Sequence, residues 1–258
     1  MEPFVKNDSI TRQIWGKGDT ILFIFAGASA EFALNKAVDW LYYTGKLPSD
    51  PLGRLFSTVA YARGIVFAGM EDAYAAIDKI TAIHKAVEKS RDAVIPDWAY
   101  RDVLFMLIHY SIASYELLER KLNEEEKDEV FNVFYRVGSR MGLKDLPLDY
   151  PGWRIMQQAH LEKDLIKSRY TTDLFKQYKK HLGGLRFHLL IESQKLVVPQ
   201  TVKDLLGFKK SLWLPAVLPL YKLARVLKTD WFLKSLILPK AYRQQVKDLD
   251  IVNNFLIV

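Results

Sequence analysis

Residues 97–121, DWAYRDVLFMLIHYSIASYELLERK, decide the fold class of this chain. The stretch contains no glycine or proline, and its apolar side chains recur with the spacing of a helix. Phe105, His109 and Ile112 fall on one face of such a helix. The same periodicity runs through almost the whole chain, while strand-like alternation is nearly absent. The sequence therefore predicts an all-α, multi-helix fold.

Turn and capping residues divide the chain into separate helices. Gly18-Asp19-Thr20 precedes a strongly apolar segment that Asp19 or Thr20 would cap, and Asp50-Pro51 is typical of a helix start. Asn123 and Glu126 have the spacing of a capping box, which explains the acidic run 124–129 without a function. The expected helices cover about residues 20–44, 51–69, 71–89, 97–121, 123–142, 152–181 and 185–197.

The composition indicates one globular domain. Half of the 258 residues are hydrophobic and 13% are aromatic, which is enough for a large core. Because no internal repeat or linker is evident, we expect a single domain over residues 1–258. The absence of cysteine excludes disulfides, thiolate-bound metals and cysteine nucleophiles, and it fits a reducing compartment.

Charge and hydropathy favour a cytoplasmic protein. The N-terminal residues lack a secretory signal pattern, and the apolar run 21–30 is about half the ~20 residues that span a bilayer. The net charge is +7, but the basic residues are dispersed, so we expect a solvated basic surface and no nucleic-acid partner. The tail around Trp213 and Trp231 is aromatic and basic, which leaves peripheral membrane contact open as an alternative.

The common catalytic motifs are missing, and this leaves the histidines as candidates. The chain has no phosphate-binding loop, nucleophile elbow, zinc-type His-Glu-x-x-His or Glu-x-x-His element. His181 and His188 flank a glycine pair, and His160 follows two glutamines, so all three are expected near the surface. His84 and His109 lie on apolar helix faces, where a buried structural histidine and a metal ligand are both open readings.

Several short motifs, in order, resemble those of the MpaB-type oxygenases, which include the latex-clearing rubber oxygenases. The resemblance covers roughly residues 18–240. It rests on Gly18-Asp19, Asp50-Pro51-x-x-Arg54-Leu55-x-x-Thr58, Ile83-His84-x-x-Val87, Leu107-Ile108-His109-Tyr110-Ser111 and Met141-Gly142-Leu143.

This resemblance implies a helical fold with a globin-like core, a b-type haem, and oxidation or cleavage of an apolar, often isoprenoid, substrate by dioxygen. By position, His84 would be the ligand of the haem iron, and Arg54 and Thr58 would line the haem pocket. His109 would be a distal polar group or a partner that orients another ligand. Asp39 is the nearest candidate for the catalytic carboxylate.

The chain also departs from the rubber oxygenases. Ser57 stands where those enzymes carry a lysine directly before the threonine. This difference, with the missing secretion signal, favours a smaller apolar substrate over rubber. The alternative to an oxygenase is a non-catalytic haem-binding or lipid-binding helical protein, either free or in peripheral contact with a membrane.

Overall fold

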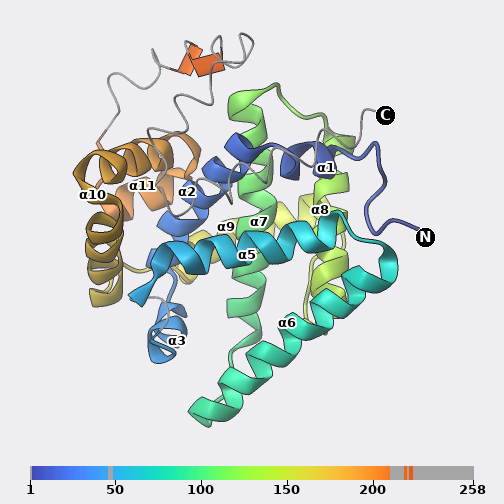
Figure 1. Ribbon diagram of the computed structural model, residues 1–258, viewed down its shortest axis with the longest axis horizontal. Coiled ribbons are helices and arrows are strands. Elements are labelled where there is room, and N and C mark those ends of the chain that lie inside the picture. The colour runs from blue at the N-terminus through green and yellow to red at the C-terminus, as the bar shows by residue number, and fades with distance from the viewer. Residues whose placement is uncertain (1, 46–48, 210–217, 220, 223–258) are drawn as a thin grey trace.

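The described part of the chain contains ten labelled α-helices, joined by loops and turns, and no strand (Figure 1). The computed structural model describes residues 2–45, 49–209, 218–219 and 221–222, without the side chains of residues 52 and 54–56. The predicted all-α fold is confirmed. The helices are α1 (Ile10–Trp15), α2 (Gly18–Leu34), α3 (Val38–Tyr43), α5 (Pro51–Val66), α6 (Met70–Arg91), α7 (Asp97–Leu118), α8 (Glu124–Arg140), α9 (Tyr150–Lys163), α10 (Arg169–Val197) and α11 (Gln200–Leu206).

Helix α2 lies at the centre of the molecule. It is apolar on nearly all sides, and it packs against α7 and α10 and also against α1, α3, α5 and α11. A helix that is apolar all round has to be covered by others, so the remaining helices arrange themselves about it. Helix α6 extends diagonally away from the end of α5 in Figure 1, and it contacts α5 and α8.

Several predicted helix boundaries are confirmed. The Asp50 carboxylate accepts the Gly53 N–H at 2.9 Å, with Pro51 in the first turn of α5. Asn123 and Glu126 form the capping box that begins α8. Gly183, with φ of 75°, interrupts α10 where the glycine pair predicted a break. By contrast, α2 begins at Gly18, so Asp19 lies inside the first turn instead of capping it.

Two long helices expected from the sequence are each broken in the structure, so those two predictions are wrong. The segment 20–44 divides at Asn35, whose side-chain oxygen accepts the Ala37 N–H and so ends α2. The segment 152–181 divides between α9 and α10, where Ser168 caps the new helix. The two breaks face each other, because Lys36 N–H donates to the Asp164 carbonyl and Ile166 N–H to the Leu34 carbonyl. Tertiary hydrogen bonds therefore offset the lost helical ones.

The alternative of peripheral membrane contact concerns the tail around Trp213 and Trp231, and both residues lie outside the described part of the chain. Across the helices that are described, none has the length and apolar character needed to cross a bilayer.

Candidate functional site

His84 lies half-buried on α6 with its ring orientation set by two contacts. Its Nδ1 is 2.9 Å from the Ile80 carbonyl oxygen one turn earlier. A carbonyl only accepts, so Nδ1 donates its proton in this bond. The edge of the ring meets Tyr100 of α7, with the ring centroids 5.1 Å apart.

Glu88 supports this arrangement through Tyr100. One Glu88 oxygen accepts the Tyr100 hydroxyl at 3.2 Å and the Ile95 N–H at 2.8 Å. Burial, with the charge of Glu88, raises the pKa of Tyr100, so the phenol keeps its proton and continues to donate. Glu88 therefore holds in place the ring that packs on His84.

Asp39 reaches the same side of α6 from α3. Its carboxylate pairs with Arg91 at 2.7 Å, and the Arg91 guanidinium lies over the Trp40 ring, 4.1 Å from its centroid. Arg91 follows His84 by seven residues, which places it on the same helix face, about 10 Å along the axis. The carboxylate predicted to be catalytic is thus fixed by an ion pair on the His84 side of α6.

The remaining pocket residues predicted from the sequence belong to α5, which packs against α6. The Thr58 side chain is half-buried, as is its neighbour Ser57. Arg54 is on the same helix, but its side chain lies outside the described part of the structure.

His109 is on the opposite face of α7 from Tyr100, since nine residues correspond to two and a half helical turns. The structure therefore separates His109 from the His84 side of α7. Its Nε2 is buried and makes no hydrogen bond with any described atom. Burial lowers the pKa of His109, against the raising effects of Glu31 and the Val197 backbone, so its imidazole is neutral.

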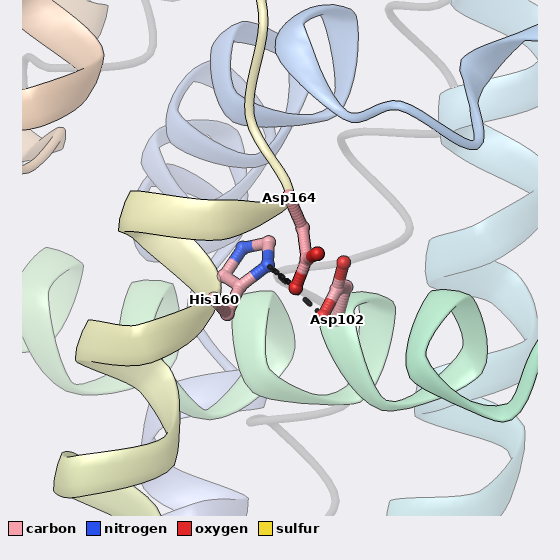
Figure 2. A group of neighbouring side chains, drawn as sticks. All are labelled: Asp102, His160 and Asp164. Carbon is pink, nitrogen blue, oxygen red and sulfur yellow. Dashed lines mark ion pairs between the residues drawn. The ribbon is translucent and has the colours of Figure 1, made fainter.

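The face of α7 that carries His109 also carries Asp102, and there the structure assembles a buried polar cluster. His160 Nε2 lies 3.0 Å from a Glu31 oxygen, and the Tyr110 hydroxyl donates to the other Glu31 oxygen at 2.6 Å. His160 Nδ1 lies 2.9 Å from Asp102 Oδ1 and 3.7 Å from Asp164 Oδ2. Figure 2 shows Asp102 of α7, His160 of α9 and Asp164, which follows α9, with their side chains pointing toward one another. The cluster joins α2, α7 and α9.

His160 is 3% exposed, so its predicted place near the surface is wrong. Burial by itself lowers the pKa of His160, but Asp102 and Glu31 more than offset this and raise the pKa to about 9. A sequence signal for its burial existed. Tyr150, Trp153, Gln157 and His160 recur at helical spacing and are all buried in α9, although the adjacent glutamines make the stretch look polar.

A small cavity of about 190 Å³ adjoins the cluster. Asp102, His160 and Asp164 line it together with Arg101 and Lys163. Polar groups that converge beside a cavity can bind a ligand or an ion.

Comparison with known proteins gives one family. Residues 14–247 match the family described as the catalytic domain of the ER-bound oxygenase mpaB/B′ and rubber oxygenase. Neither a curated protein nor a solved structure matches the chain.

Proposed function

The chain belongs to the family of ER-bound mpaB-type oxygenases and rubber oxygenases, and on that premise we propose that it is a haem-dependent oxygenase. It would act with dioxygen on an apolar substrate. The structural observation that carries the proposal is the 2.9 Å contact between His84 Nδ1 and the Ile80 carbonyl.

The chemistry of His84 fits a haem ligand. A histidine that binds a metal commonly donates its other ring N–H to a carbonyl or carboxylate, which fixes the tautomer and orients the ring. The bond to Ile80 has this form, so Nε2 is the ring nitrogen that would bind the iron. Tyr100, held by Glu88, restricts rotation of the His84 ring.

The other residues are assigned from this starting point. Arg54 would bind a haem propionate through charge-assisted hydrogen bonds, and the Thr58 hydroxyl would line the haem pocket. Asp39 would hold or accept a proton at its carboxylate on the same side of α6. When bound, haem iron would supply dioxygen binding and activation.

An apolar substrate agrees with the surface beside His84. Ile83 is 44% exposed although it is a large aliphatic residue, and Ile80 packs partly buried one turn away. Apolar walls next to the iron ligand would bind a hydrophobic molecule and exclude water from the reacting atoms.

The first prediction concerns haem retention. Protein expressed with supplemented haem should show a Soret band, and His84→Ala should lose it, because the proposed iron ligand is removed. The matched control is His188→Ala, which changes an exposed histidine on α10 and should leave the band unchanged. Absorption spectra of the freshly purified variants provide the measurement.

Three outcomes contradict the proposal. Wild-type protein without a Soret band would contradict haem binding, and a His84→Ala variant with the normal band would exclude His84 as the ligand. Haem binding without oxygen consumption, measured with reductant and a panel of apolar substrates, would identify a carrier instead of an oxygenase.

A further inference from the structure

The buried cluster on α2, α7 and α9 has no part in the haem proposal and carries an excess of negative charge. Three carboxylates surround one imidazole: Glu31, Asp102 and Asp164. Glu31 and Asp102 are almost completely buried, where an uncompensated charge is costly. The cluster therefore favours a cation at its centre.

The hydrogen-bond geometry indicates where this cation would lie. His160 Nε2 contacts Glu31, while Nδ1 is buried and faces two carboxylate oxygens. Asp102 Oδ1 is within hydrogen-bond distance of Nδ1, yet it lies off the direction of an N–H bond, so Nδ1 has no directed hydrogen-bond partner. An ion bound here would displace the Nδ1 proton and leave the other proton on Nε2, and the Nδ1 lone pair and two carboxylate oxygens would then point at one position.

We propose that His160 Nδ1, Asp102 Oδ1 and Asp164 Oδ2 bind a divalent first-row transition-metal ion (Figure 2). The three atoms all lie within 4.8 Å of one another. Metal–ligand bonds of about 2.1 Å put neighbouring ligands about 3.0–3.4 Å apart, and the observed 2.9 and 3.7 Å bracket this range. One imidazole and two carboxylates suit Mn²⁺, Fe²⁺ or Zn²⁺.

Hydrogen bonds with surrounding residues orient His160 and Asp102 for metal binding. Glu31 accepts from the far nitrogen of His160, as carboxylates do behind metal-bound histidines. Tyr110 in turn holds Glu31. Asn35 donates to Asp102 Oδ2 at 2.7 Å, which engages that oxygen and leaves Oδ1 toward the metal position.

The adjoining cavity explains how an ion would enter and complete its coordination. Asp102, His160 and Asp164 line this cavity, and Asp164 is the most exposed of the three. Water in the cavity would fill the remaining positions of the ion. The metal would then cross-link α7 to the C-terminal end of α9, beside the break at Asn35.

The second prediction tests this site with Mn²⁺ as the probe. Full-length protein stripped with a chelator should bind one equivalent of Mn²⁺, measured by electron paramagnetic resonance, and its Tm should rise by several degrees. Asp164→Asn removes a ligand at the partly exposed edge and should abolish both effects. Glu31→Gln should weaken Mn²⁺ binding about 10–100-fold, because it perturbs only the support of His160.

The matched control is Glu162→Gln, which changes an exposed carboxylate on α9. This variant should bind Mn²⁺ as the wild type does. Wild-type protein that binds no stoichiometric Mn²⁺ would overturn the proposal, and so would Asp164→Asn with unchanged affinity. Circular dichroism of each variant confirms that it is folded. Because the readout is metal content and Tm, it is independent of haem binding and of the oxygenase proposal.

Discussion

At the scale of a residue, Gly27 lets α2 approach α7 closely. A Cβ atom added there would lie 2.1 Å from the Tyr110 ring, which is itself held by Glu31. Replacing glycine by alanine inside a helix ordinarily stabilises it by ~1 kcal/mol. Here the clash outweighs that gain, and we expect Gly27→Ala to lower the free energy of unfolding by about 2 kcal/mol or more. Urea denaturation measures the change.

Gly64 on α5 provides the matched control for this third prediction. It is exposed, and an added Cβ would meet open space. Gly64→Ala should therefore raise the stability by about 0.5 kcal/mol. Equal responses at the two glycines would contradict the close contact of Gly27 with Tyr110.

At the scale of an element, α8 depends on its capping box. The Asn123 side chain accepts the Glu126 N–H at 2.8 Å, and the Glu126 carboxylate accepts the Asn123 N–H at 3.0 Å. The hydrogen bonds from Arg120 and the cap lower the pKa of Glu126 to about 2, so the cap stays intact at neutral pH.

The fourth prediction is that Asn123→Ala lowers the free energy of unfolding by ~1 kcal/mol, because it leaves backbone N–H groups of α8 without their acceptor. Asn123→Gly should cost only a few tenths of a kcal/mol, since water reaches the freed groups. Chemical denaturation of both variants tests this, and a larger loss for glycine than for alanine would refute it.

At the scale of the whole molecule, stability depends on the burial of α2 beneath the other helices. Ile24 on this helix is 1% exposed. The fifth prediction is that Ile24→Ala lowers the free energy of unfolding by about 2–5 kcal/mol, through lost burial and the cavity left behind. Ile155→Ala is the control, because Ile155 is 73% exposed and its truncation should change stability by less than about 0.5 kcal/mol. Similar losses at both sites would argue against a central α2.

The helices that the sequence predicted correctly depend on local signals. Caps such as Asp50 and Asn123, and the glycine at 183, act within a few residues along the chain. The two wrong predictions concern helices that break at Asn35 and before Ser168. Those breaks are stabilised by hydrogen bonds between segments far apart in sequence, which no local pattern records.

The two candidate sites differ in the same respect: one is marked by local motifs, and the other is assembled from separate helices. The motifs around His84 and Thr58 are contiguous, and they led to a family that the comparison confirmed. The cluster of Glu31, Asp102 and His160 comes from three separate helices and was missed. Besides the helical spacing of the buried residues of α9, a carboxylate within the apolar helix α2 was a hint in the sequence, because an ionised group is buried there only with partners.

The sequence by itself determined the helical class, most helix boundaries, the family and His84 as the candidate haem ligand. Periodicity, capping and motif spacing are local properties that a chain carries before it folds. Only the tertiary structure decided that His160 is buried, that the Tyr100 face of α7 packs against His84, and that α2, α7 and α9 share a polar cluster. These outcomes depend on which helix faces pack together, and that is set by burial summed over the whole molecule.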